Sequence, residues 1–590
     1  MRAPRRVCSP IAVPRRVFTP VLVSLSALLF AASSHAGWQS GGVQLATFPA
    51  EGYVEWGSMV PNGSGGAIVS WMHTFTYPYP SDRSDFELRA QQVDENGDIP
   101  APWPAAGAVV RAWSWQNPGS ASITPMPLLT DGAGGAIAPE TSLENIVEYI
   151  NRFHLFRLAS NGTVTGVPGY SGSYTGPAAT AVQVDVDGAG GIIMMAIQET
   201  FAGPPNTPPP GDLYAQRVDP QGNALWSPRP VFCNSGILGG GWDVLADGTG
   251  GGFFAWCEEA GGGVFELFVQ HLDGTGSLAP GWPVDGRLVR SGTGAVSRVM
   301  LAPDGTEGAI VVWRDERNGE PHLFAHHVTA AGAVDSAIPA NGRALASGNL
   351  NDEIVNVASD AQEGVFVIRD SHDNFSNRQS RLYRLDPAML PHAGWPAEGR
   401  LMPGRGVMAP DGSGGTFLAW YLTDEYPYDL FAQHLASDGS PAPGWTESGY
   451  QLTSAVASFD IVRSGAGAIV AWIDRRPDAP GLYAQQLLTN GVVGVPAPPF
   501  EPGRLALRAP YPNPGTGPAT FSVTLPTQAP GSIELLDLQG RRIAHRDLGS
   551  FDAGQHMVTI DEAATVAPGV YLTRLSHGTE MRTVRLIRIR

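Results

Sequence analysis

The stretch that decides the fold reads Asp304-Gly305-Thr306-Glu307-Gly308-Ala309-Ile310-Val311-Val312-Trp313-Arg314-Asp315. A glycine-rich phrase opens it, and such a phrase fits a tight turn with a positive φ at one or more positions. The run 309–313 is apolar at successive positions, which predicts a strand buried on both faces. A charged turn starts at Arg314 and ends the strand. A tight turn followed by a doubly buried strand is therefore the basic unit.

The glycine-rich phrase recurs along the chain, each time before an apolar run. Consecutive copies begin 69, 56, 60, 57, 56, 51 and 53 residues apart. A repeat at such a period is the signature of a solenoid, a propeller or a domain array. The eight copies begin at Asn62, Asp131, Asp187, Asp247, Asp304, Asp360, Asp411 and Ser464.

Each repeat contains four short apolar runs. The doubly buried run and its polar turn are followed by a second run, such as 267–272 or 482–487. Another glycine turn follows, several repeats then carry Gly-Trp-Pro, as at Gly281-Trp282-Pro283, and two further runs precede the next phrase. Four strands per repeat are typical of a propeller blade. We therefore predict that residues 37–502 form a β-propeller of seven or eight four-stranded blades, with eight favoured by the repeat count.

Two other repeat architectures fit less well. A β-solenoid usually has a shorter repeat, and a row of separate sandwich domains needs units of roughly 100 residues. The repeat also lacks the patterns of tryptophan-aspartate and kelch propellers. The composition agrees with an all-β fold, because 73 glycines and 51 prolines favour short strands joined by turns.

The amino terminus has the parts of a secretory signal peptide. Five arginines precede or flank the start of an apolar run of about 12 residues at 21–32, and Ser34-His35-Ala36 supplies a small-residue cleavage site. We expect cleavage after Ala36, which removes residues 1–36. The apolar run is too short for a stable membrane span, and no transmembrane segment is expected in the mature chain.

Charge and cysteine content restrict the partners. The net charge of −18 disfavours nucleic acid, because binding to phosphates needs clustered basic residues. Cys233 and Cys257 remain once the signal peptide is removed. They can form a disulfide in an oxidising compartment or stay as two small buried residues, and the sequence leaves both open. No metal-ligand spacing of cysteine and histidine occurs, and no cofactor is indicated.

Two features of the repeat have possible chemistry. The aspartates of the glycine-rich phrase suggest calcium, but an EF-hand loop needs more oxygen ligands and a distal glutamate. We favour an aspartate that accepts hydrogen bonds from its own turn. His271, His327 and His434 share one repeat position, which Arg217 and Gln486 occupy in other repeats. That exchange argues against a shared metal and favours a polar side chain at a strand edge or blade contact.

Catalytic signatures do not occur. Carboxylate pairs occur at Glu258-Glu259 and Asp424-Glu425, where we expect turns. We therefore interpret both pairs as solvent-exposed charges on loops and not as paired acid and base groups. The sequence lacks the Gly-x-Ser-x-Gly elbow, the His-Glu-x-x-His helix and the phosphate-binding Gly-Lys-Ser/Thr loop. No catalytic residue is therefore predicted.

A different module follows Pro502. Alternating runs at 519–525, 531–537 and 569–575 belong to about seven short strands in residues 503–590, which predicts a small β-sandwich. Its short motifs are Tyr511-Pro512-Asn513-Pro514, the turn Asp537-Leu538-Gln539-Gly540-Arg541, Gly554-Gln555-His556 and Gly569-Val570-Tyr571.

These motifs resemble the type A C-terminal sorting domain of type IX secretion (Por secretion) substrates, and the related immunoglobulin-like module of the flagellar hook-capping protein. The resemblance rests on Pro512, Asn513, Pro514, Gly540, Gly569 and Tyr571 and covers about 80 residues. It implies an immunoglobulin-like sandwich, a Gram-negative cell and export by the outer-membrane secretion machinery. The protein would then be secreted or held at the outer cell surface.

Three functions remain open on the sequence alone. The first is a binding or interaction module for a glycan or a protein, because propellers present a central channel and loop-rich faces on a rigid scaffold. The second is an extracellular enzyme, such as a glycoside hydrolase or lyase, with its site on one propeller face. The third is a structural component of the cell surface.

Overall fold

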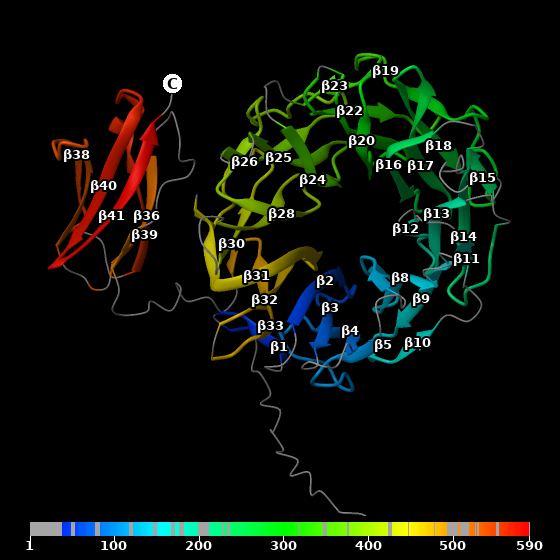
Figure 1. The fold of residues 1–590 in the computed structure, drawn as a ribbon, viewed down its shortest axis with the longest axis horizontal. Helices are drawn as coiled ribbons and strands as arrows, with labels where there is room; N and C mark the ends of the chain where they lie inside the picture. Colours follow the sequence, from blue (N-terminus) through cyan, green and yellow to red (C-terminus); the bar gives the residue numbers. More distant parts are fainter. Residues whose placement is uncertain are drawn as a thin grey trace, which may run out of the picture. The chain divides into compact units, whose positions relative to one another are not determined.

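The computed structural model is built almost entirely from antiparallel β-strands (Figure 1). It describes residues 38–492 and 505–588, apart from residue 40 and the segments 49–52, 77–82, 117–121, 146–149, 167–171, 176–181, 199–211, 227–228, 233–236, 318, 346–350, 374–376, 423–427, 447, 477, 508–518, 526, 528–529 and 550–553. The described residues form 41 strands and one short 3-10 helix, η1 (Asp561–Ala564).

Blades 1 to 4 each pair their strands antiparallel in chain order. Blade 1 contains β2 (Tyr53–Pro61), β3 (Ala67–Thr76), β4 (Arg83–Val93) and β5 (Ala108–Gln116). Blade 2 has a divided inner strand, β6 (Ser122–Pro125) and β7 (Leu129–Thr130), then β8 (Ala136–Asn145), β9 (Ile150–Leu158), β10 (Val164–Gly166) and β11 (Gly172–Thr175). Blade 3 contains β12 (Val182–Val186), β13 (Ile192–Gln198), β14 (Asp212–Val218) and β15 (Arg229–Phe232). Blade 4 contains β16 (Ile237–Ala246), β17 (Gly252–Gly261), β18 (Val264–Leu272) and β19 (Arg287–Thr293).

Blades 5 to 8 repeat this pattern. Blade 5 contains β20 (Val296–Pro303), β21 (Ala309–Asp315), β22 (His322–Val328) and β23 (Arg343–Ala344). Blade 6 contains β24 (Asn351–Ser359), β25 (Val365–Asp373), β26 (Asn377–Leu385) and β27 (Arg400–Met402). Blade 7 contains β28 (Arg405–Pro410), β29 (Thr416–Tyr421), β30 (Tyr428–Leu435) and the first part of β31 (Tyr450–Ser464). Blade 8 contains the second part of β31, then β32 (Gly467–Asp474), β33 (Gly481–Leu488) and β1 (Val43–Thr47), with the short β34 (Gly491–Val492) also paired to β33.

The first strand of the chain completes the last blade. Strand β1 pairs antiparallel with β33, with Val43 opposite Ala484 and Thr47 opposite Gly481 (Figure 1). Blades 8 and 1 also meet directly, because Ser464 Oγ donates to the carbonyl of Gly66 at 2.8 Å. The eight inner strands follow one another around a closed ring, which confirms the higher of the two predicted blade numbers.

The glycine-rich phrase and its buried run behave as predicted, but β21 continues through Arg314 and Asp315, where a turn was expected. Gly305 has a φ of +81°, and a side chain at Gly308 would collide with the carboxylate of Asp304 and the carbonyl of Val328. All five residues of the run 309–313 are fully buried. Alternate residues of this run belong to different cores, because the two faces of β21 pack against different neighbouring blades.

A tryptophan links six of the eight blade interfaces; the interfaces between blades 2 and 3 and between blades 5 and 6 lack this link. In the six linked interfaces the indole N–H donates to a backbone carbonyl in the next blade, at 2.8 to 3.1 Å. Glycines of the next blade leave room for the ring; a β-carbon at Gly332, for example, would lie 2.9 Å from Trp282. The linking tryptophans are Trp38, Trp103, Trp226, Trp282, Trp395 and Trp445. This contact explains the Gly-Trp-Pro motif of the repeat.

The carboxyl-terminal module is a two-sheet sandwich, as predicted. One sheet has the order β35-β36-β39, and the other has the order β38-β37-β40-β41. The inward side chains of both sheets form one core that includes Phe521, Leu535 and Leu575. The seven strands are β35 (Ala506–Leu507), β36 (Ala519–Leu525), β37 (Gly531–Leu536), β38 (Arg542–Asp547), β39 (Gly554–Ile560), β40 (Gly569–His577) and β41 (Glu580–Arg588).

Candidate functional site

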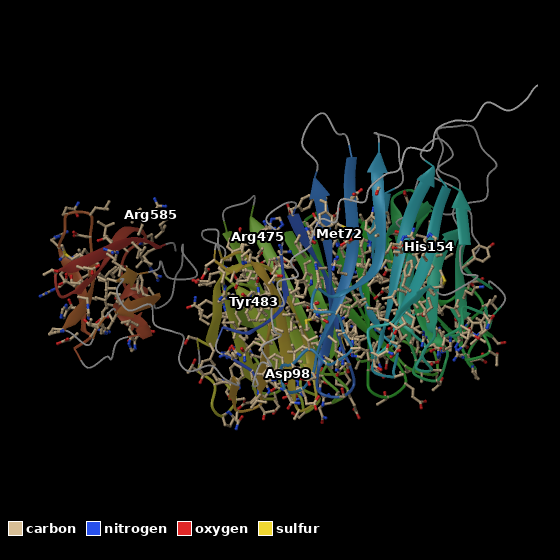
Figure 2. The ribbon with its side chains drawn as sticks, turned by 90° about the horizontal axis from the view of Figure 1, so that it is seen from below. Met72, Asp98, His154, Arg475, Tyr483 and Arg585 are labelled. Atoms are coloured by element: carbon tan, nitrogen blue, oxygen red, sulfur yellow. The ribbon has the colours of Figure 1, made fainter. Side chains whose placement is uncertain are left out.

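The propeller has two faces that the chain builds differently. One face, which we call the Gly-turn face, carries the glycine-rich phrases and the turns between third and fourth strands, such as the turn that ends at Asp98 (Figure 2). The opposite face, the hairpin face, carries the turns between second and third strands. Met72, His154 and Arg475 lie toward it (Figure 2). The predicted site residues divide between these faces.

On the Gly-turn face, the aspartates of the glycine-rich phrase bind their own turns. Asp304 Oδ1 accepts the backbone N–H groups of Thr306 at 2.7 Å and Gly308 at 2.8 Å. The other aspartates of the phrase make the same pair of contacts. The described residues contain no group of three or more potential metal ligands. These aspartates therefore act in the turns, as the sequence favoured.

The repeat-position histidines bind those same aspartates. His271, His327 and His434 place Nε2 at 2.9, 2.8 and 2.9 Å from Oδ2 of Asp247, Asp304 and Asp411. Burial alone would raise the pKa of each aspartate, but hydrogen bonds from the histidine and the turn lower it to about 2. The three histidines lie one per blade and do not converge.

Arginines take the same position in other blades. Arg217 Nε lies 2.9 Å from Asp187 Oδ2, and Arg384 Nε lies 2.8 Å from Asp360 Oδ2. Histidine and arginine therefore make the same contact at this position. In each case a side chain of the third strand binds the carboxylate of the aspartate in the glycine-rich turn. His326 occupies the register position that holds Gln270 in blade 4.

One buried position breaks the repeat. Five blades end the doubly buried run with a fully buried tryptophan: Trp71, Trp256, Trp313, Trp420 and Trp472. Blade 2 has Glu140 there, blade 3 has Ala196 and blade 6 has Arg369. The sequence signal for these exceptions was the missing tryptophan, which a comparison of the eight repeats can detect.

Glu140 is a buried carboxylate between blades 1 and 2. Its side chain is 0% exposed, and Arg111 Nη1 of blade 1 lies 3.1 Å from its Oε1. Burial raises the pKa of Glu140 to about 7, because the single guanidinium offsets only part of the desolvation. His154 is its direct cross-strand neighbour.

Blade 6 replaces the tryptophan with an ion-pair network. Arg369 Nη2 lies 2.6 Å from Asp352 Oδ1, and Arg369 Nη1 donates to Tyr383 Oη at 3.0 Å. His322 of blade 5 completes the network, with Nδ1 at 3.2 Å from Asp352 Oδ2. The ring of Tyr383 packs over Gly399, where tryptophans of other blades pack over the equivalent glycine. The network therefore substitutes for the missing indole.

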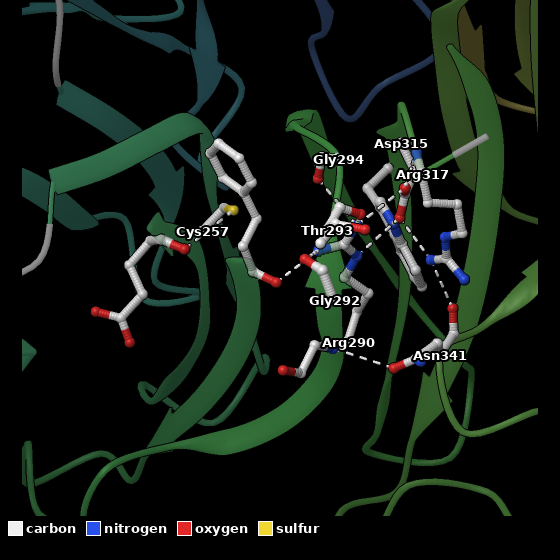
Figure 3. Close-up of polar contacts among 12 residues, drawn as sticks. Cys257, Arg290, Gly292, Thr293, Gly294, Asp315, Arg317 and Asn341 are labelled. Atoms are coloured by element: carbon white, nitrogen blue, oxygen red, sulfur yellow. Dashed lines mark hydrogen bonds and ion pairs between the residues drawn. The ribbon is translucent and has the colours of Figure 1, made fainter. Parts of the chain in front are cut away.

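A second buried arginine joins blades 4 and 5 (Figure 3). Arg290 is 1% exposed, and its guanidinium donates to the carboxylate of Asp315 and to the carbonyls of Phe265, Gly292, Thr293 and Gly294. Asp315 also accepts from the indole of Trp313 at 3.0 Å and from Arg317. Because all of its donors are used internally, Arg290 is a structural residue.

Three aspartates join inner strands of neighbouring blades. Asp185 Oδ2 accepts Ala246 N–H at 2.8 Å, and Asp243 Oδ2 accepts Leu301 N–H at 2.8 Å. Burial raises the pKa of Asp243 to about 7, with a further contribution from nearby Asp185, and it raises the pKa of Asp460 to about 6. These contacts join the inner strands of neighbouring blades and were not predicted from the sequence.

The carboxylate pair in blade 4 does not lie in a turn, so that expectation was wrong. Glu258 and Glu259 belong to strand β17, and Glu258 is 5% exposed. Burial raises the pKa of Glu258 to about 7, helped by Glu266, which stands directly opposite on β18. The reason is that β17 continues past Trp256 instead of turning there. The second pair, Asp424-Glu425, lies outside the described residues.

The remaining predicted residues fall in two places. Cys257 is a buried thiol whose pKa burial raises to about 12, and Cys233, Ala36, Pro512, Asn513 and Pro514 lie outside the described residues. In the sandwich, Gly540 has a φ of +79° in an exposed turn, and Gly569 begins β40. Tyr571 Oη donates to the carbonyl of Ala567 at 2.7 Å.

Within the described residues, no helix has the length and apolar character to cross a membrane.

Comparison with known proteins separates the two modules. Residues 509–590 match the family model of the secretion system C-terminal sorting domain. No curated protein sequence matches the chain. Among solved structures, an α-L-arabinofuranosidase from Fusarium graminearum is 12% identical, over 53% of this chain and 92% of its own, with a TM-score of 0.29.

Two further solved structures show the spread of the likeness. The WD40 domain of SCAP from fission yeast is 9% identical, over 75% of this chain and 94% of its own, with a TM-score of 0.30. The polysaccharide lyase Uly1 is 8% identical, over 74% of this chain and 90% of its own, with a TM-score of 0.33. At these values the likeness does not bear on function.

The fold and the family match together define the class: a β-propeller followed by a type IX secretion C-terminal sorting domain. A domain of this kind marks cargo of the type IX secretion machinery. The protein is therefore secreted or attached to the outer cell surface.

Proposed function

We propose that the propeller is a binding module for a glycan or a protein, delivered to the cell exterior by the sorting domain. The observation that carries this proposal is the contrast between the two propeller faces. On the Gly-turn face, the repeat-position aspartates bind the histidines or arginines of the third strand within each of blades 3 to 7. On the hairpin face, the amino acids at equivalent repeat positions differ from blade to blade. Variable loops on a rigid scaffold are typical of binding proteins.

An enzyme is the less favoured function. Glu140 and Glu258 have pKa values raised to about 7, which suits a general acid, but their side chains are almost completely buried. They also belong to different blades. A hydrolase or lyase needs such groups to converge where a substrate can reach them.

The test uses the full secreted chain, immobilised and exposed to a panel of polysaccharides and a panel of extracellular matrix proteins. Binding is measured by biolayer interferometry, and the same mixtures are assayed for new reducing ends and unsaturated sugars. We expect binding to a member of one panel without product. Product formation contradicts a binding module, and so does the absence of binding to both panels.

Four finer assignments belong to the same proposal. We infer cleavage after Ala36, domains at 37–502 and 503–590, an immunoglobulin-like topology for the second domain, and a possible Cys233–Cys257 disulfide. The packing of Trp38 supports the first, and the sheet orders β35-β36-β39 and β38-β37-β40-β41 support the third. Amino-terminal sequencing and non-reducing mass spectrometry of the secreted chain test the cleavage and the disulfide.

A further inference from the structure

Three aromatic side chains meet at the hairpin-face end of the interface between blades 7 and 8. Tyr421 ends β29, Tyr428 begins β30, and Phe459 lies on the inner strand β31. The ring centroids of Tyr421 and Tyr428 are 5.0 Å apart, and those of Tyr421 and Phe459 are 5.7 Å apart at 83°. All three side chains are partly exposed. We call this group the aromatic cluster.

The repeat does not require these rings. The residue after the blade tryptophan position is Tyr421 in blade 7, but no other blade has an aromatic residue there. The other seven are Met72, Thr141, Ile197, Cys257, Arg314, Asp370 and Ile473. The register position of Phe459, opposite Trp472, holds Gly406 in blade 7 and Ile354 in blade 6, whereas blades 1 and 4 have Trp56 and Trp242 there. The three rings pack against the core between blades 7 and 8, but the fold tolerates non-aromatic side chains at both positions and so does not require three partly exposed rings there.

A charged group lies on the strand next to Tyr421. Arg405 is the register partner of Tyr421 on β28, and its side chain is 42% exposed. Its Nε lies 3.2 Å from Asp370 Oδ2, and Asp370 is 1% exposed. The buried carboxylate holds the guanidinium in place, and the guanidinium keeps donors that the single ion pair does not use.

We infer that the aromatic cluster binds a neutral sugar chain, an inference that rests on the proposed binding function. An aromatic face matches the C–H face of a pyranose ring, and the guanidinium can bind the ring hydroxyls at its edge. The charge of the propeller excludes polyanions, because residues 37–502 contain 48 Asp and Glu against 22 Arg. The ligand class is therefore an uncharged polysaccharide.

The test is affinity electrophoresis of the full secreted chain in gels that contain soluble β-glucan, xylan, arabinan or galactomannan, with alginate as the polyanion. We expect retardation by at least one neutral polymer and none by alginate. Tyr421→Ile and Phe459→Ile introduce residues that other blades carry at the same positions, which protects the fold. Each variant is expected to weaken binding at least 10-fold.

The control is Tyr450→Ala on the same strand β31. Tyr450 lies edge-on to Trp445 with its hydroxyl bonded to the carbonyl of Gly444, away from the aromatic cluster, so this variant keeps its binding. Thermal unfolding checks that all variants fold. Retardation unchanged by Tyr421→Ile and Phe459→Ile overturns the inference and leaves the binding module intact. Binding of protein ligands alone, or of alginate alone, also overturns the inference.

Discussion

The indole of Trp38 packs over Gly97, and its N–H donates to the carbonyl of Glu95 at 2.9 Å. This contact joins the segment before β1 to blade 1. Together with the pairing of β1 and β33, it closes the ring. Trp38 stands five residues before β1, as Trp282 stands five residues before β19, so it is one more copy of the linking tryptophan.

Replacement of Trp38 should destabilise the closed ring. Trp38→Ala removes a buried indole and its hydrogen bond, and we expect a loss of about 3–5 kcal/mol in the free energy of unfolding. Trp38→Phe keeps most of the packing and should cost about 1 kcal/mol for the hydrogen bond. Urea unfolding of the secreted chain measures both. Equal stability of Trp38→Ala and the parent would show that the closure does not depend on this residue.

At the interface between blades 5 and 6, other residues replace both the linking tryptophan and the glycine over which it packs. Ile338 replaces the tryptophan, and Met389, with a φ of +58°, replaces the glycine. Both side chains are buried in one core. We expect Ile338→Trp alone to destabilise by about 1–3 kcal/mol because Met389 fills the space. Met389→Gly alone should also destabilise, since it empties a buried site.

The double variant Ile338→Trp with Met389→Gly introduces the tryptophan–glycine pair that is found at five other interfaces. We expect it to be more stable than the sum of the single effects by about 1–3 kcal/mol. Thermal and urea unfolding of the four proteins complete the cycle. Additive effects would show that the two residues do not compensate each other.

Most of the propeller was predictable because its repeat carries local signals. Gly305 marks a turn, the run 309–313 marks a doubly buried strand, and eight copies give eight blades. The closing strand was missed because β1 precedes the first glycine-rich phrase, so no repeat boundary announces it. Its only signal was Trp38.

The polar contacts between blades were not predictable in the same way. Asp243 bonds to Leu301, 58 positions further along the chain, and Glu140 pairs with Arg111 across a blade interface. Such contacts depend on how neighbouring blades pack, which the repeat does not encode residue by residue. The turn assigned to Glu258-Glu259 failed for a related reason, because the length of β17 past Trp256 differs from that of β21 past Trp313.

Stability should fall as the pH rises from about 4.5 to about 7. The pKa of Glu140 is raised from 4.5 to about 7, so the folded state binds this proton more tightly than the unfolded state does. The stabilisation is complete below pH 4.5 and is lost through pH 7. Glu258 and Asp243 act in the same direction. Two sets of groups oppose this trend. Asp247, Asp304 and Asp411, with pKa values of about 2, make the protein less stable as the pH falls below about 3.8, and His326, whose pKa burial lowers, makes it less stable as the pH falls through about 6.5.

Glu140→Gln isolates one of these groups. Because glutamine mimics the protonated acid, the variant should exceed the parent in stability at pH 8, by up to about 3 kcal/mol for the shift of Glu140. The two proteins should converge near pH 4, below the unfolded-state pKa of 4.5. Urea unfolding at both pH values tests this. A variant less stable than the parent at pH 8 would show that the ion pair with Arg111 outweighs the desolvation of the carboxylate.

Removal of the sorting domain should stop export at the periplasm. A chain that ends after Leu505 keeps the described propeller strands but loses residues 509–590, which match the sorting-domain family. We expect it in the periplasmic fraction, with the parent in the medium or on the cell surface. Resistance of the periplasmic product to trypsin shows that the propeller has folded, so that misfolding is not the reason for retention. A truncated chain that still leaves the cell would mean that another segment directs export.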